Sequence, residues 1–396
     1  MGSECINDHE TDDQESVSLK RIRVLFYSGV GVYLMSDAGK RMQFIDAIKG
    51  VAIIVVIIYH LVAPCGFKSV TDHLVELSLT LFFFYSGYFY RPGKRSISES
   101  IKNKAKSLMV PFFRYSLSFW VVGSIYLIVT KNETLKEAGL CLRNFLAGCI
   151  WNRVIQNGFG WEYYSLGKRY FYLADFWFLI AMLLSSILFF LMADWALKSD
   201  IKVIVTVLAL FAATGICQSF SVSLPYNFQL APYWAAFMLL GAYAGQKDLT
   251  VFPTLSQGAT CILAVLLFAV GIVIVMLKEP SVNMFRGSFG QNEVLSMILC
   301  IASAVPFVWG IGILFAQIEK AGVRLNEIAW LGSHSLFLYL FHMFYAWIIS
   351  VITGFSVRYE EPVSSGVLAG SIILTAASLC LCILRGYLDD RLVKKR

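Results

Sequence analysis

Two ionisable residues lie on one face of the first long apolar segment, residues 41–64, RMQFIDAIKGVAIIVVIIYHLVAP. Lys49 and His60 are eleven residues apart, which is about three turns of an α-helix and roughly 16 Å along its axis. Histidine is the common general base for activating a hydroxyl group, and an ammonium group binds anions. The spacing therefore predicts a base at one end of a site and an anion-binding group at the other.

The surroundings of these residues indicate that they line a site. Ionisable groups in a membrane-spanning helix cost a few kcal/mol each, so they face the protein interior or a wet cavity. Asp46 lies near the same face, but it is about 21 Å from His60 and is placed instead to pair with Lys49 at i, i+3. A packing role for His60, as a hydrogen-bonding residue between helices, is the alternative.

The composition predicts the elements that position these residues. The chain has 396 residues, of which 58% are hydrophobic and 15% charged, and its mean hydropathy is +0.67. Apolar runs of about 20 residues recur along it, so we predict an all-α, polytopic integral membrane protein with about ten transmembrane helices. The expected spans are 47–64, 73–90, 110–130, 172–192, 201–218, 227–245, 257–277, 293–316, 329–352 and 366–384.

The distribution of charge predicts the orientation. A net charge of +7 would suggest nucleic acid as a partner of a soluble domain, but here it reflects basic loops, and we expect no nucleic-acid partner. The 91–109 loop and the C-terminal residues are the more basic connections, so both termini are predicted to be cytoplasmic. We expect a polar, disordered extension with a short apolar segment at 1–40, a membrane domain at 41–385 and a basic tail at 386–396.

With this orientation, several polar residues fall in the outer half of the membrane. His60, Glu76 and His342 come out at similar depth, and Glu76 is the best-placed carboxylate partner for His60. The predicted catalytic residues are therefore His60 and Glu76. The predicted acceptor-side residues are His342, Trp177, Asp175, Asn292 and Ser86. A packing role stays open for His342, and close helix packing is the favoured role of the neighbouring Gly87.

The inner half is basic instead. Lys49 and Arg114 lie inside apolar runs near the cytoplasmic side, and a basic loop joins the second and third spans. Such a cluster suits a phosphate-bearing ligand, although topology alone also explains the loop charges. The predicted donor-binding residues are Lys49, Asp46, Arg114, Arg91, Lys94 and Arg95. The nine cysteines are scattered without a CxxC pair, so no metal site is expected.

Several stretches together resemble a known family. These are FIDAIKGVAIIVVIIYH, FFFYSGYFYR, KNKAKSLMVPFF, DFWFLIAML, FGQNEVL and LGSHSLFLYLFH, in this order. Their order and spacing resemble the membrane-bound acyltransferase 3 family, close to the sugar O-acetylases of bacterial surface polysaccharides. The opening helix of that family carries a basic residue, ten further residues and then a histidine, and Lys49 and His60 fit this signature.

The resemblance implies ten helices, an acyl-coenzyme A donor drawn from the cytoplasm and transfer to a hydroxyl, usually of a glycan. It also implies that His60 is essential and that basic residues near the cytoplasm hold the donor. Acetyl-coenzyme A would be a co-substrate, with no bound cofactor, and the partners would be a glycan or lipid-linked sugar and the lipid of a bacterial inner membrane. Two features depart from the family pattern: lysine replaces the commoner arginine at position 49, and Arg91, Lys94 and Arg95 replace a tighter arginine pair.

The main alternative is a transporter or flippase that moves a lipid-linked sugar without chemistry, since polar midplane residues would serve that function too. A glycan polymerase is a further alternative. A histidine on a basic stripe favours catalysis over transport. A polymerase would need external basic residues for a diphosphate-linked donor, whereas the strongest basic cluster here is predicted to be cytoplasmic. The acceptor sugar, the acyl chain, an acyl-histidine intermediate and the oligomeric state stay open at this point.

Overall fold

The structure is a computed structural model that describes residues 42–62, 68–131, 134–136, 139, 177–221, 224–248, 255–277, 287–290, 292–354 and 365–394. The predicted N-terminal extension, residues 1–40, lies outside the described residues. So does most of the long connection before residue 177.

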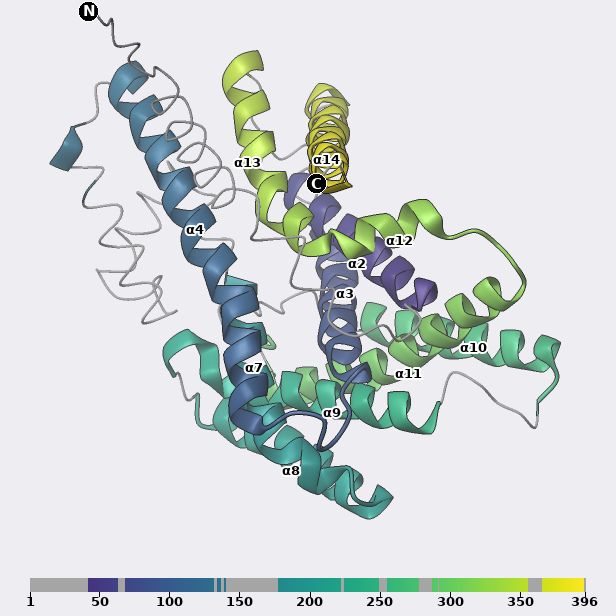
Figure 1. The fold of residues 1–396 in the computed structure, drawn as a ribbon. Coiled ribbons are helices and arrows are strands. Elements are labelled where there is room, and N and C mark those ends of the chain that lie inside the picture. The colour runs from purple at the N-terminus through teal and green to yellow at the C-terminus, as the bar shows by residue number, and fades with distance from the viewer. Residues whose placement is uncertain are drawn as a thin grey trace, which may run out of the picture.

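The described residues fold into helices (Figure 1). Their bounds are α2 Gln43–Val62, α3 Lys68–Tyr88, α4 Ile97–Lys131, α7 Trp177–Ala196, α8 Asp200–Ser219, the 3-10 helix η3 Pro225–Leu230, α9 Ala231–Lys247, α10 Gln257–Met276, α11 Glu293–Lys320, α12 Asn326–Ser333, α13 Ser335–Thr353 and α14 Ser365–Lys394. The predicted tail at 386–396 is thus largely the last part of α14. Each predicted span falls on a helix, and the span at 329–352 covers two helices, α12 and α13, that meet at His334.

Among the described residues, eight helices are long and apolar enough to cross a membrane. They are α2, α4, α7, α8, α10, α11, α13 and α14. The prediction of an all-α polytopic membrane protein is therefore confirmed. Of the predicted spans, α3 and α9 do not meet these criteria, because α9 has 17 residues and the first half of α3 carries Asp72, His73 and Glu76.

The two helices that do not meet these criteria, α3 and α9, pack against each other in the core. A Cβ atom on Gly87 of α3 would overlap the carbonyl oxygen of Met238, and one on Gly241 of α9 would overlap that of Phe84. Small residues let helix backbones approach closely in membrane proteins. The packing role expected for Gly87 is confirmed. Because protein covers much of α3, this helix can carry more polar residues than a helix that faces lipid.

A second close approach joins α2 to α12. A Cβ atom on Gly50 would overlap the carbonyl oxygen of Ile328, and one on Gly332 would overlap that of Asp46. The helix then breaks at His334, which caps the end of α12 and the start of α13. In Figure 1, α13 and α14 lie side by side, and these two helices contact each other and α2. The contact between α2 and α12 therefore sets where α13 begins.

The long helix α4 runs along one side of the molecule (Figure 1). Its 35 residues span about 52 Å, which exceeds the roughly 30 Å of a bilayer's hydrocarbon core. The first turns, which carry Lys102 and Lys104, therefore extend beyond the apolar layer. Further along, Phe119 stacks on Phe344 of α13 with ring centroids 4.2 Å apart, which ties α4 to α13.

The Gly87 contact predicts a stability effect. Alanine normally stabilises the interior of a helix by about 0.5–1 kcal/mol relative to glycine. At position 87 the added methyl group would overlap the backbone of α9, so we expect Gly87→Ala to destabilise the protein by about 1–3 kcal/mol. The measurement is the thermal unfolding temperature of the detergent-purified protein. The matched control is Gly258→Ala in α10, where a Cβ atom meets nothing within 4 Å. Equal stability of the two variants would contradict this packing.

Candidate active site

Two histidines from helices far apart in the sequence meet in the structure. His60 lies near the end of α2 and is half-buried, whereas His342 of α13 is fully buried, with 0% of its surface exposed. Their ring centroids are 5.3 Å apart and their planes are tilted by 42°. The structure thus brings a predicted catalytic residue together with a predicted acceptor-side residue.

Hydrogen bonds fix the tautomer of His342. Its Nδ1 atom lies 3.0 Å from the carbonyl oxygen of Leu338 and 2.8 Å from that of Tyr339. Carbonyl oxygens only accept, so Nδ1 carries the hydrogen and Nε2 carries the lone pair. Nε2 is buried and has no hydrogen-bond partner within the described residues. Ser378 of α14 donates to the backbone carbonyl of His342 at 2.5 Å, which holds α13 in place.

Glu76 is buried in α3, with 2% of its surface exposed. It lies close enough to the buried hydroxyl of Tyr233 in α9 to act on it electrostatically. The ring contacts of His60 are with Tyr59 and His342. The structure places His342 against His60, and the pairing of Glu76 with His60 stays a prediction.

A pair of lysines lies at the other end of α2. Lys49 Nζ is 5.9 Å from the ring centroid of Phe89, and Lys104 Nζ of α4 donates to Ser86 Oγ at 2.8 Å. The two ammonium groups are close enough to repel each other. An anion bound between them would relieve this repulsion, so the pair forms a candidate phosphate site.

Two of these assignments differ from the sequence analysis. Lys104 was not among the predicted donor-binding residues. Its signal was the basic run KNKAK before Pro111, in a loop whose charges suit a phosphate-bearing ligand but are also explained by topology alone. Ser86 was predicted on the acceptor side, but its hydroxyl lies beside Lys104.

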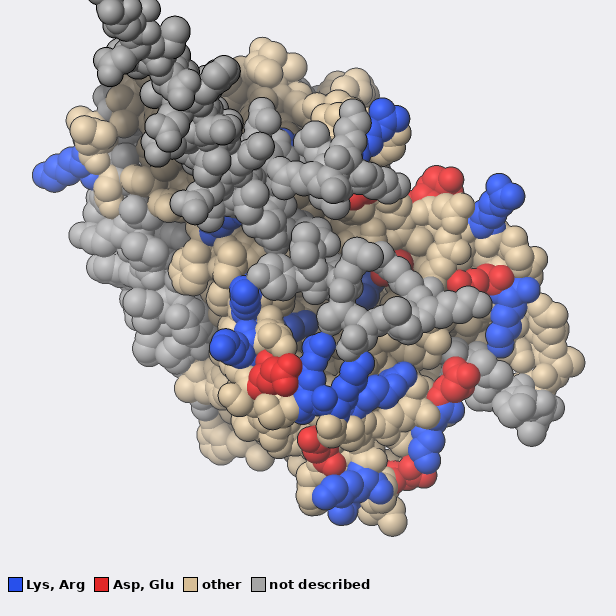
Figure 2. All heavy atoms as spheres, in the orientation of Figure 1, with Lys and Arg blue, Asp and Glu red and all other residues tan. Residues whose placement is uncertain are grey.

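The loop between α3 and α4 presents further cations. Arg91, Lys94 and Arg95 are all exposed on it. Figure 2 shows Lys and Arg side chains gathered on the part of the surface where, in Figure 1, this loop and the start of α4 lie. The basic residues of this loop thus lie on the same side as the lysine pair.

Asp194 of α7 anchors this loop. Its Oδ1 atom accepts hydrogen bonds from the Tyr90 hydroxyl at 2.7 Å and from the Gly93 backbone N–H at 3.3 Å. The Tyr90 ring packs edge-on against Phe189 with centroids 5.0 Å apart. Burial and the bond to Asp194 raise the pKa of Tyr90 well above its usual range, so the hydroxyl stays a donor at neutral pH.

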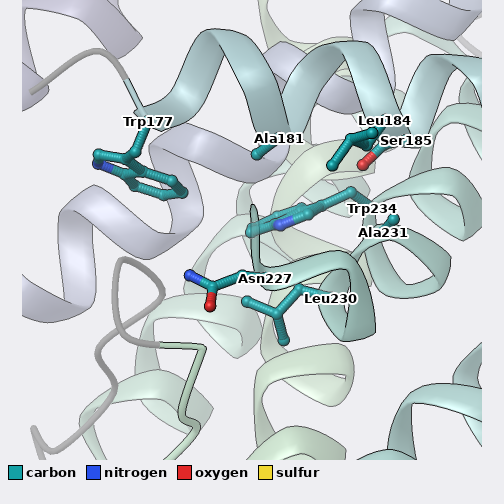
Figure 3. A pocket seen from close by; sticks show the side chains of 8 residues that line it. All are labelled: Trp177, Ala181, Leu184, Ser185, Asn227, Leu230, Ala231 and Trp234. Atoms are coloured by element: carbon teal, nitrogen blue, oxygen red, sulfur yellow. The ribbon is translucent and has the colours of Figure 1, made fainter. Parts of the chain in front are cut away.

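The remaining predicted residues are spread over several helices. Arg114 is half-buried in α4, with its guanidinium 5.8 Å from the ring centroid of Tyr115. Asp46 lies in the first turn of α2, and Asn292 is exposed and precedes α11 without a capping bond from its side chain. Trp177 begins α7 and lines a pocket (Figure 3). Asp175 lies outside the described residues.

A model of a protein family, described as an acyltransferase domain, matches residues 42–385. The chain belongs to the acyltransferase 3 family. The matched region of this acyltransferase begins just before α2 and ends within α14, so it includes both histidines and both lysines. Comparison with curated proteins and with solved structures gave no match.

The Asp194 anchor predicts a change in the mobility of the basic loop of the acyltransferase. Asp194→Ala removes two hydrogen bonds, each contributing about 0.5–1.5 kcal/mol. We expect trypsin to cleave after Lys94 or Arg95 several-fold faster than in the wild type, measured by mass spectrometry of the fragments.

The matched control for this experiment is Asp390→Ala. This change removes the bonds that Asp390 of α14 accepts from Trp330 and His334, away from the loop. Equal cleavage rates of the loop in the wild type and Asp194→Ala would show that Asp194 does not hold it.

Proposed function

We propose that this acyltransferase moves a short acyl group, most simply acetyl, from acyl-coenzyme A to a hydroxyl of a surface or lipid-linked glycan. The observation that carries the proposal is the contact between His60 and His342, with the buried Nε2 lone pair of His342. Membership of an acyltransferase family supports group transfer over the transport of a lipid-linked sugar.

The donor site of the proposal is the basic end of α2. Lys49 and Lys104 would bind phosphates of coenzyme A, and Arg91, Lys94 and Arg95 would attract the donor to this face. Asp46 would orient Lys49, and Arg114 would supply a further cation. Lys49 lies roughly 16 Å from His60 along α2, and the extended pantetheine arm bridges such a separation. Coenzyme A enters and leaves as a co-substrate.

The chemistry of the proposal is general-base catalysis. His60 removes the proton from an acceptor hydroxyl, and the oxygen attacks the thioester carbonyl. The new C–O ester bond forms as the C–S bond breaks, and the proton passes to the departing thiolate. His342 has its N–H directed at backbone carbonyls, so its Nε2 accepts a hydrogen bond from the site and stabilises a protonated His60. Glu76 has no part in the proton transfer that we propose.

The proposed setting is the inner membrane of a bacterium. The donor would come from the cytoplasm to the basic end of α2, and the acceptor would reach the histidines from the outer half of the membrane. The positive-inside rule supports this orientation, because the basic loop and the C-terminal end of α14 lie on the same predicted side.

If His60 is the general base, its substitution lowers the activity. We expect His60→Ala to lower the rate of transfer from acetyl-coenzyme A to extracted glycan by about 10²–10⁴-fold, since a positioned base contributes that much. The measurement is the incorporation of radiolabelled acetyl groups at matched levels of purified protein. Ile58→Ala, two residues away and 37% exposed, is the control and should keep the wild-type rate. A His60→Ala protein as active as this control would contradict the role of His60.

The proposed phosphate site predicts that substitution of either lysine, Lys49 or Lys104, lowers the affinity for the donor. Hydrogen bonds to charged groups contribute about 1.5–3 kcal/mol, so Lys49→Gln and Lys104→Gln should each raise the acetyl-coenzyme A concentration at half-saturation by about 10–100-fold. Binding of radiolabelled acetyl-coenzyme A measures the effect directly.

The matched control for the lysine pair is Lys102→Gln. This change removes the same charge from an exposed position two residues earlier on α4. Equal losses in all three variants would show that net charge matters rather than a phosphate site.

A further inference from the structure

The turn that follows α3 presents an aromatic ring beside the lysine pair. Phe89 is 50% exposed, and Lys49 Nζ lies over its ring, 5.9 Å from the ring centroid. Lys104 is bonded to the hydroxyl of Ser86, three residues before Phe89 on the chain. An apolar ring thus borders the candidate phosphate site.

The backbone is held in place on both sides of Phe89. The residue before it, Tyr88, is 1% exposed, and its carbonyl oxygen packs so closely on α9 that a Cβ atom on Gly245 would overlap it. The residue after it, Tyr90, donates through its hydroxyl to Asp194 of α7 at 2.7 Å. The exposed ring therefore stands between two anchored residues.

Arg91 fixes the same turn. Its Nη1 atom donates to the carbonyl of Tyr88 at 3.1 Å and to that of Tyr90 at 3.0 Å, so it bonds to the backbone on either side of Phe89. A ring on such a constrained backbone loses little conformational freedom when a ligand packs on it, and this preorganisation favours binding. The turn thus holds an exposed ring ready for a flat partner.

The neighbouring charges define the chemistry of that partner. Lys49 and Lys104 repel each other, and a ligand that carries phosphate relieves this repulsion. A nucleotide base stacks on an aromatic ring and needs no hydrogen bond to do so. A phospholipid also carries phosphate, but its flexible acyl chains gain no more from a flat ring than from any other apolar side chain. A base and phosphates in one molecule therefore suit this set best, and coenzyme A has its adenine next to its phosphates.

We propose that Phe89 stacks on the adenine base of the acyl-coenzyme A donor, beside the phosphates that Lys49 and Lys104 bind. The inference rests on the proposed function, because it assigns a further residue to the donor site of the same reaction. Phe89 then distinguishes donors by their base, whereas the lysines bind phosphate whatever molecule carries it.

The test measures how two soluble competitors displace radiolabelled acetyl-coenzyme A from the detergent-purified protein. ADP carries the base and a diphosphate, whereas inorganic pyrophosphate carries the phosphates alone. Because stacking on an aromatic ring contributes to the binding of the base, Phe89→Leu should raise the dissociation constant of ADP about ten-fold. The dissociation constant of pyrophosphate should stay at the wild-type value.

Two further variants complete the experiment. Phe220→Leu is the matched control, because Phe220 directly follows α8 as Phe89 follows α3, and it is 76% exposed. This variant should leave both dissociation constants unchanged. Phe89→Trp keeps a flat ring and should bind ADP at least as tightly as the wild type does.

Each contrary outcome separates this inference from the proposed function. Equal dissociation constants of ADP in the wild type and Phe89→Leu would overturn the stacking and leave Phe89 as a contact for lipid. An equal loss of pyrophosphate and ADP binding would also overturn it, since Phe89 would then act through Lys49. Failure of the wild-type protein to bind acetyl-coenzyme A would contradict the proposed function itself and, with it, this inference.

Discussion

The contact between α2 and α12 at Gly50 and Gly332 is the constraint on which the site depends. In lipid there is little hydrophobic force between helices, so helix pairs are held by close packing through small residues. These two glycines leave room for backbone against backbone. Because α13 begins directly after α12 at His334, this contact also fixes His342 two turns further on, against His60 of α2. The hydrogen bond from Ser378 to the carbonyl of His342 adds α14 to the same arrangement.

The arrangement separates two kinds of polar chemistry along one helix. His60, near the end of α2, and His342 of α13 lie among aromatic and aliphatic side chains, where a neutral imidazole is tolerated. The lysine pair lies near the start of α2, beside the exposed loop that Asp194 holds. A long donor with a charged end and a reactive end fits these two places at once, which is why the distance along α2 matters as much as either group alone.

The sequence predicts much of the fold, because local hydrophobic runs decide which segments become membrane helices. Every expected span falls on a helix of the structure. The structure departs from that prediction where tertiary contacts decide. No proline at His334 predicts the break between α12 and α13. The helices α3 and α9 pack inside the protein and are not among the long apolar helices that could cross a membrane.

The candidate site shows the same limit of sequence reasoning. The shared face of Lys49 and His60 follows from helical periodicity alone and needs no knowledge of other helices. The contact of His60 with His342 depends on how distant segments pack, and matching depths favoured Glu76 equally well. Lys104 belongs to a basic run whose charges suit a phosphate or set the topology, and only its bond to Ser86 and its nearness to Lys49 distinguish it from the other lysines of that run.

The measurement that tests the central claim most directly is an electron cryo-microscopy structure of the protein with acetyl-coenzyme A bound. The account predicts phosphate oxygens within hydrogen-bond distance of Lys49 and Lys104, about 2.7–3.2 Å, and the thioester beside His60 and His342. A donor whose phosphates lie away from both lysines, or whose thioester lies away from the two histidines, would contradict it.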